Sequence, residues 1–186
     1  EEAFAYLSAW DTARRAQGEP LVIEGAGEAS FSIDERSFTL PARADRIDRL
    51  DSGAAFIIDY KTGAPPSLDQ IKTSFSPQLP LTGLIVEAGG FSALGETPVA
   101  GFEYVRVVSR KGNEKFAGAE GDDAMKYIDE AEKGLTNILR HFADPAQPYL
   151  SQPRPQFMNE FGDYDHLARR GERNAQGGGD EAGGGE

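Results

Sequence analysis

Residues 56–63 read FIIDYKTG, a short apolar run that ends in a carboxylate and an amine. Side chains alternate between the two faces of an extended strand, so Asp59 and Lys61 share one face with Ile57. Tyr60 then lies on the other face. The run therefore predicts a short strand that presents an acid and a base side by side.

The residues before this strand predict a hairpin. Residues 42–53 read ARADRIDRLDSG, which alternates as a strand and ends in a three-residue loop with glycine at its last position. Such loops commonly join antiparallel strands, because glycine accepts the left-handed conformation that they need. Counting back from the loop pairs Ile47 with Ile57. The same register places Asp45 opposite Asp59, on one face of the sheet.

Two carboxylates that face each other across a strand pair repel, which destabilises the sheet. A divalent cation between them removes that repulsion, and a site of a few carboxylates and waters suits Mg²⁺ or Mn²⁺. A neighbouring lysine can then steady a phosphate group or help to activate water. The alternative is a solvated hairpin in which Asp45, Asp59 and Lys61 form surface ion pairs, and spacing alone leaves both interpretations open.

Three segments, in chain order, resemble the motifs of a known nuclease family. ADRID, IIDYKTG and SPQLPL are similar to the motif set of the RecB-like branch of the PD-(D/E)XK nucleases. That set has an aspartate in a G-x-x-D-R-like strand, D-x-K in the next strand and Q-x-x-x-Y on the following helix. These positions fall here on Asp45, Asp59, Lys61 and Gln78. The resemblance selects Asp45 rather than Asp48 as the first acid, as the hairpin register does.

The resemblance implies an α/β fold of the PD-(D/E)XK nuclease type, with a central mixed β-sheet flanked by α-helices. It also implies a Mg²⁺- or Mn²⁺-dependent DNA exonuclease that acts in double-strand break repair and recombination. In such an enzyme Asp45 and Asp59 hold one or two metal ions, together with the Tyr60 carbonyl. Lys61 positions or helps to deprotonate the attacking water, and Gln78 positions the Lys61 side chain or a DNA phosphate.

Two positions depart from the family pattern. Ala42 stands where the family often has glycine, and Thr82 stands where the tyrosine of the Q-x-x-x-Y motif is expected. A further acid, Glu24, ends a predicted strand, where it either joins the metal site or is solvated. Two functions therefore stay open. One is an active nuclease, and the other is a catalytically weak DNA-binding scaffold within a helicase-nuclease complex.

The C-terminal segments YLSQPRPQF and DYDHLARRGE resemble the end of the AddB subunit of alphaproteobacterial AddAB helicase-nucleases. This resemblance implies DNA and an AddA-like helicase subunit as partners. Many AddB-like nucleases hold an iron-sulfur cluster through four cysteines. This sequence has no cysteine, so we expect neither such a cluster nor a disulfide.

The 186 residues suffice for one domain with a hydrophobic core. We expect the nuclease domain to span residues 1–173, and residues 174–186, mostly glycine and acids, to form a disordered tail. The first residue is Glu1 rather than Met, which indicates a fragment of a longer chain. A net charge of −12 argues against a basic nucleic-acid coat protein. No run is apolar enough to span a bilayer and there is no signal peptide, which predicts a cytoplasmic protein without membrane contact.

Hydrophobic periodicity and turn residues predict the remaining elements. They are a helix before Gly18, a bulged strand over 21–33, strands over 37–40 and 99–108, a short helix capped by Ser67 and Gln70, a helix with Pro77 as its first residue that stops at Gly89, and a long helix over 124–142. The helix that starts at Pro77 is expected to bury Leu81, Leu84, Ile85 and Ala88.

Overall fold

A computed structural model describes residues 2–73, 75–107 and 116–147 of the chain. Contacts divide the chain into two units, Glu1–Ala143 and Asp144–Glu186, and every described helix and strand lies in the first. In chain order these elements are α1 (Glu2–Arg15), β1 (Gly18–Ile33), β2 (Arg36–Leu50), β3 (Ala55–Lys61), α2 (Leu68–Lys72), α3 (Gln78–Glu87), β4 (Val99–Arg106), β5 (Phe116–Glu120) and α4 (Gly121–Ala143). The segments YLSQPRPQF and DYDHLARRGE and the expected tail lie outside the described residues.

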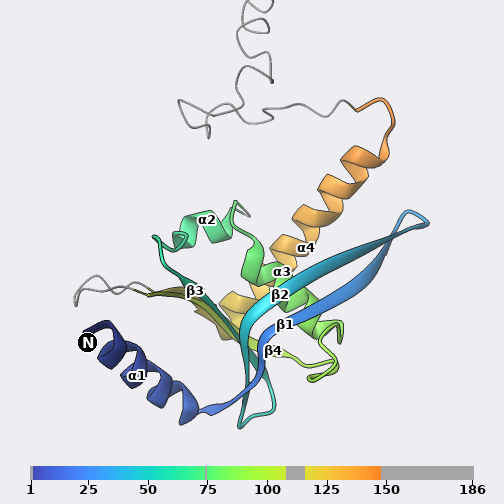
Figure 1. The fold of residues 1–186 in the computed structure, drawn as a ribbon. Helices are drawn as coiled ribbons and strands as arrows, with labels where there is room; N and C mark the ends of the chain where they lie inside the picture. Colours follow the sequence, from blue (N-terminus) through green and yellow to red (C-terminus); the bar gives the residue numbers. More distant parts are fainter. Residues whose placement is uncertain (1, 74, 108–115, 148–186) are drawn as a thin grey trace, which may run out of the picture. The chain divides into compact units, whose positions relative to one another are not determined.

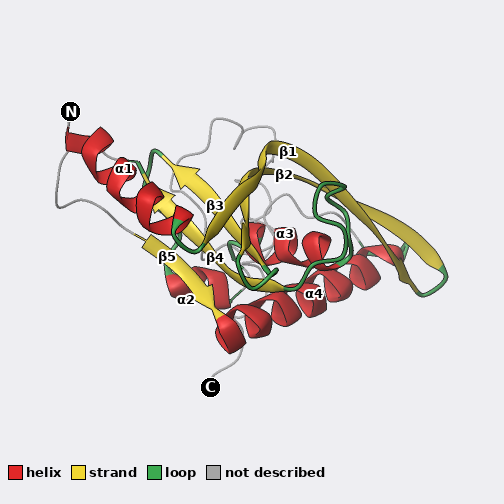
Figure 2. Cartoon of the chain, turned by 90° about the horizontal axis from the view of Figure 1, so that it is seen from below, coloured by secondary structure: helices red, strands yellow, loops and turns green. Residues whose placement is uncertain are grey.

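The strands form one mixed sheet in the order β1-β2-β3-β4-β5 (Figure 2). β3 and β4 run parallel, whereas the other neighbouring pairs are antiparallel. A parallel pair needs a crossover connection, and the chain forms α2 and α3 between these two strands (Figure 1). The mixed sheet with flanking helices confirms the predicted α/β fold class.

The hairpin of β2 and β3 has the predicted register over its paired range, which ends at Arg46 and Ile58, one residue short of Asp45 and Asp59. Ile47 pairs with Ile57, and the backbone N–H of Leu50 donates to the Ala54 carbonyl at 2.8 Å. Gly53 in the loop has a φ of 86°, in the left-handed region that glycine enters without strain. Loop length and glycine therefore set which side chains of the two strands share a face.

Different helices cover the two faces of β3. Ile57 belongs to the main core, with buried residues of α3 and α4. Phe56 and Ile58, on the other face, pack against Leu7 and Trp10 of α1. The end of β3 therefore lies between two helical layers, and residues that alternate along it meet different surroundings.

The first two strands are more continuous than the sequence predicts. The strands expected on either side of Pro41 form one strand, β2. Proline is tolerated there because β2 pairs with β3 only over the range Arg46–Arg49, so no third strand meets the missing N–H. In β1 the register shift lies between Pro20 and Val22, not at the glycines where the bulge was expected.

Helix α3 is buried on more sides than its pattern predicts. Its buried residues are Leu79, Pro80, Thr82, Gly83, Leu84, Ile85 and Val86. Leu81 is only half-buried. Ala88 is exposed, so the prediction that it is buried was wrong. Pro77 is the N-cap, and the helix begins one residue later than expected, at Gln78. A helix that is apolar nearly all round is an interior element.

Sequence patterns predicted α2 and α4 correctly but missed β5. The long amphipathic helix is confirmed as α4, and the capping box of Ser67 and Gln70 is confirmed on α2. Strand β5 was not predicted, because its sequence FAGAE has no β-branched residue. Within the described ranges, no helix combines the length and apolar character that crossing a membrane requires.

Candidate active site

Asp59 is the last buried residue of β3, with 4% of its surface exposed. Its Oδ1 accepts a hydrogen bond from Gln78 Nε2 at 2.7 Å. Its Oδ2 lies 2.7 Å from Lys61 Nζ, as an ion pair. A buried carboxylate is thus held between an amide and an amine from two different elements.

Gln78 closes this cluster from the first residue of α3. Its Oε1 accepts a hydrogen bond from Lys61 Nζ at 3.1 Å, while its Nε2 donates to Asp59. Only this orientation of the amide turns both contacts into hydrogen bonds. Gln78 therefore fixes the acid and the amine relative to each other.

Asp45 lies beside this cluster on β2. Its Oδ2 accepts a hydrogen bond from the backbone N–H of Tyr60 at 2.9 Å, at the end of β3. The side chain thus reaches across to the residue between Asp59 and Lys61. The structure brings the four predicted site residues, Asp45, Asp59, Lys61 and Gln78, into one group.

Burial raises the pKa of the Asp59 carboxyl above its ordinary value, and the negative charge of Asp45 adds to the rise. The hydrogen bonds and charge supplied by Lys61 and Gln78 act in the opposite direction, but burial is the largest effect. Burial thus favours the neutral acid more strongly than Lys61 and Gln78 favour the carboxylate. Perturbed pKa values of this kind cluster at functional sites.

This raised pKa gives a prediction for the protein without metal. Because the folded state disfavours the charged form of Asp59, stability is lost as the pH rises through the folded pKa. We expect Asp59→Asn to raise the melting temperature at pH 7 in a chelator, and the gain to shrink as the pH falls below the raised pKa. Thermal melts at several pH values measure this. A lower melting temperature for the variant at pH 7 would show that the ion pair with Lys61 outweighs burial.

Asp48 belongs to a different environment. It is fully buried, and its two oxygens accept hydrogen bonds from Arg46 at 2.5 and 2.9 Å. Arg14 of α1 lies 4.0 Å away, and Arg46 also donates to the Tyr60 hydroxyl at 3.4 Å. This buried ionic cluster lies on the face covered by α1. Asp48 therefore serves packing between α1 and the sheet and is separated from Asp45 by the strand.

Tyr104 is a site neighbour that the sequence pattern did not reveal. It pairs with Asp59 across the parallel strands, and its ring centre lies 5.5 Å from Lys61 Nζ. Its hydroxyl accepts a hydrogen bond from the Leu79 N–H at 3.3 Å, and burial raises its pKa to about 12. The alternation of apolar residues along β4 predicts that Tyr104 is buried. Only the order of strands in the sheet places it next to Asp59.

Two residues left open by the sequence have local partners. The Oγ1 atom of Thr82 donates to the Gln78 carbonyl at 2.9 Å, one turn back along α3. Glu24 is exposed and forms an ion pair with Arg43 at 3.1 Å. Neither side chain contacts the group formed by Asp59 and Lys61 in the interactions described.

A cavity of about 520 Å³ adjoins this group. It is lined by Lys61, Ala64, Pro65, Pro66, Gln70, Ser76, Pro77, Gln78 and Tyr104. The amine of Lys61 and the amide of Gln78 are its main polar groups next to Asp59. The cavity has the size of sites that hold small organic molecules, and it leaves room for a nucleotide.

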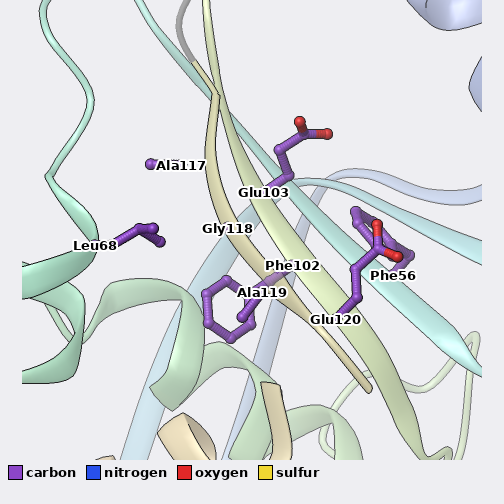
Figure 3. Close-up of a pocket in the computed structure, with 8 residues that line it drawn as sticks. All are labelled: Phe56, Leu68, Phe102, Glu103, Ala117, Gly118, Ala119 and Glu120. Carbon is purple, nitrogen blue, oxygen red and sulfur yellow. The ribbon is translucent and has the colours of Figure 1, made fainter. Parts of the chain in front are cut away.

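A second cavity, of about 270 Å³, lies at β4 and β5 (Figure 3). It is lined by Phe56, Leu68, Phe102, Glu103, Ala117, Gly118, Ala119 and Glu120. Burial raises the pKa of Glu103, whose carboxylate and that of Glu120 lie on the same side of these strands as Phe56 (Figure 3). The lining has neither a cation nor any of the four predicted site residues, so this cavity is separate from the site.

The donor set at Asp45 and Asp59 fits a hard divalent cation. Within the described ranges no three or more His, Cys, Asp or Glu side chains form a metal cluster. Mg²⁺ does not need one, because it usually keeps several waters and binds one or two carboxylates together with substrate phosphates. The Oδ2 atom of Asp59 is buried and has no well-aligned hydrogen bond, although Lys61 is close. A metal ion would give this oxygen a partner.

Comparison with known proteins gives a family. Residues 1–154 match the family model of the PD-(D/E)XK nuclease superfamily. An uncharacterized protein of Rickettsia bellii is 25% identical over 171 residues, which is 85% of this chain and 20% of that protein. An uncharacterized protein of Rickettsia felis is 31% identical over 90 residues, which is 48% of this chain and 10% of that protein. The chain therefore spans at most a fifth of the length of these two relatives.

A solved structure also aligns with the chain. The crystal structure of SSO0001 covers 69% of this chain and 62% of that chain, with a TM-score of 0.39 and 16% identity.

Proposed function

The chain belongs to the PD-(D/E)XK nuclease superfamily, and we propose that it hydrolyses phosphodiester bonds in DNA with the help of Mg²⁺ or Mn²⁺. The observation that carries the proposal is the contact of Asp59 with both Lys61 and Gln78, with Asp45 beside it. A solvated hairpin would not need a buried carboxylate held by a residue from a separate helix.

In this proposal Asp45 and Asp59 hold the metal ion, together with the Tyr60 carbonyl. The bound ion would act as a Lewis acid that stabilises charge on the phosphate and lowers the pKa of a bound water. The two carboxylates supply the negative charge that retains it. The hydrogen bond from the Tyr60 N–H keeps Asp45 turned toward the end of β3.

Lys61 orients the reactants. Its side chain is 32% exposed, so the amine reaches both the buried acid and the neighbouring cavity. An ammonium group donates up to three hydrogen bonds, and here it donates to Gln78 and forms an ion pair with Asp59. The remaining N–H is available for the attacking water or for a phosphate oxygen.

Gln78 supports the same reaction from the start of α3. The free N–H groups at a helix N-terminus attract anions, so a phosphate next to Gln78 meets a favourable field. Gln78 also keeps Lys61 from turning away, since its Oε1 accepts from the amine. We therefore assign it a positioning role rather than a part in proton transfer.

The finer proposal is a DNA exonuclease domain that works with an AddA-like helicase subunit in double-strand break repair and recombination. It is supported by the motif order and by the AddB-like segments near the C-terminus. A helicase partner would also supply DNA to a chain whose net charge of −12 repels phosphate. The second candidate, a catalytically weak DNA-binding scaffold, is favoured by Thr82 at the position of the motif tyrosine.

Digestion of end-labelled single-stranded DNA tests the proposed function. We expect Mn²⁺ to support loss of the label, a chelator to abolish it, and Asp59→Asn to abolish it with Mn²⁺ present. DNA binding that is tight in chelator and unchanged by Asp59→Asn, without cleavage, would identify the scaffold instead.

Metal binding distinguishes the two acids of the hairpin strand. We expect Asp45→Asn to weaken Mn²⁺ binding at least about tenfold, because even the outer partners of metal ligands typically contribute 10- to 100-fold. Asp48→Asn should change it little, since Asp48 is held by Arg46 on the other face. Isothermal titration calorimetry of folded variants measures both. The opposite order of effects would exclude Asp45 as a ligand.

A further inference from the structure

A smaller cavity, of about 190 Å³, lies between β2 and α3. It is lined by Leu40, Pro41, Ala42, Arg43, Gln78, Leu81, Thr82 and Ile85. We call it the ribbon pocket, because one wall comes from the part of β2 that pairs with β1 alone (Figure 1). Three of its lining residues, Ala42, Gln78 and Thr82, occupy motif positions.

The ribbon pocket and the larger cavity next to Lys61 share one wall residue, Gln78. The Gln78 amide is fixed on Asp59 and Lys61, so this wall does not swing away. The two cavities therefore adjoin at Gln78, the residue that borders the proposed reaction centre. A strand whose phosphate lies at Lys61 would have neighbouring groups within reach of the ribbon pocket.

The lining of the ribbon pocket is mostly apolar, which favours a ligand with an apolar surface. Five of its eight lining residues are aliphatic or proline. The one hydroxyl, that of Thr82, already donates to the Gln78 carbonyl. The volume equals about six molecules of liquid water at roughly 30 Å³ each, which suits one ring system but not a whole nucleotide.

The rim of the ribbon pocket supplies one cation. The Arg43 side chain is 70% exposed and is paired with Glu24, which is 59% exposed. Exposed ion pairs contribute little to stability, so a phosphate can compete with Glu24 for this guanidinium. An apolar slot with a cation at its rim is complementary to a nucleobase and the phosphate next to it.

We propose that the ribbon pocket binds one unpaired nucleobase of the DNA strand whose phosphate lies at Asp59 and Lys61. This rests on the proposed function. A base that is stacked and paired in a duplex cannot enter such a pocket, so the proposal names an unpaired or frayed strand as the substrate. Aliphatic walls read no hydrogen-bond pattern of a base edge, so we expect no strong preference among the four bases.

The test is a scan with abasic positions. Fluorescence anisotropy would measure binding of labelled oligothymidine in Ca²⁺, a non-catalytic stand-in, with one abasic nucleotide placed at each position in turn. For the unmodified protein we expect one position at which the abasic nucleotide weakens binding about tenfold, because burial of one ring against the apolar wall is lost. Cleavage in Mn²⁺ is measured on the same oligonucleotides.

Matched variants show where the base binds. Thr82→Phe fills the ribbon pocket from α3, and Ala42→Phe fills it from β2, so both should bind the intact strand about tenfold more weakly and lose the sensitivity to the abasic position. Thr39→Phe is the control. It also replaces a threonine by phenylalanine, but at an exposed position of β2, so binding should remain sensitive to the abasic position. Because the two filling substitutions lie on different elements, the test can still be made if one of the variants does not fold.

The outcomes separate this proposal from the proposed function. Metal-dependent cleavage with equal binding at every abasic position would overturn the ribbon pocket and leave the nuclease intact. Sensitivity at one position without any cleavage would support the pocket and overturn the nuclease. Sensitivity that persists in both filling variants would show that the base binds elsewhere, and absence of both binding and cleavage would overturn both proposals.

Discussion

Replacing Lys61 by alanine is expected to lower the rate of metal-dependent DNA cleavage about 100-fold or more, the usual effect of removing a group that acts in the transition state. The fold should survive, because the side chain is partly exposed at the end of β3. What is lost is the amine that contacts both Asp59 and Gln78. Single-turnover rates with saturating Mn²⁺ and end-labelled DNA measure the effect.

Lys126→Ala is the matched control for this substitution. Lys126 is exposed on α4, and its removal changes the net charge by the same amount. We expect its cleavage rate to equal that of the unmodified protein. If Lys61→Ala cleaves DNA as fast as Lys126→Ala, then Lys61 has no part in the reaction and the proposed mechanism is wrong.

Replacing Asp48 by alanine is expected to reduce the free energy of unfolding by about 3–5 kcal/mol, as is typical when one partner of a buried ion pair is removed. Asp48 is fully buried and accepts two hydrogen bonds from Arg46, which is 6% exposed. Burial lowers the pKa of the Arg46 guanidinium, but the hydrogen bonds to Asp48 and Asp11 hold it above its usual range. The arginine therefore stays charged after the substitution and has lost its main partner.

Urea unfolding measures this change in stability. Asp51→Ala, in the exposed loop of the same hairpin, is the control and should shift the free energy of unfolding by no more than about 0.5 kcal/mol. A loss below about 1 kcal/mol for Asp48→Ala would mean that water replaces the carboxylate beside Arg46.

The sequence predicts half of the site well because that half is local. Alternation along β3 and a three-residue loop with Gly53 determine the register, and the register places Asp45 near Asp59 and turns Asp48 away. These rules act over a few residues, and they hold whatever the rest of the chain does. Family motifs added Gln78, which no spacing rule connects to Asp59.

The other half depends on contacts between segments that are distant in the chain. The parallel pairing of β3 with β4 brings Tyr104 beside Asp59. The sequence of neither strand determines which strand will be its neighbour in the sheet. Likewise Pro41 lies within a continuous strand because β2 runs past the end of β3 there.

The sequence by itself determined the hairpin, the faces of its acids and the capping box of α2, since each follows from local backbone geometry and side-chain period, and the α/β class came from the family resemblance. Only the tertiary structure decided that α3 brings Gln78 within 2.7 Å of Asp59 and leaves the ribbon pocket beside it. The physical reason is that strand order and helix docking are chosen by burial of whole apolar faces, such as the nearly all-apolar surface of α3, and not by any short stretch of residues.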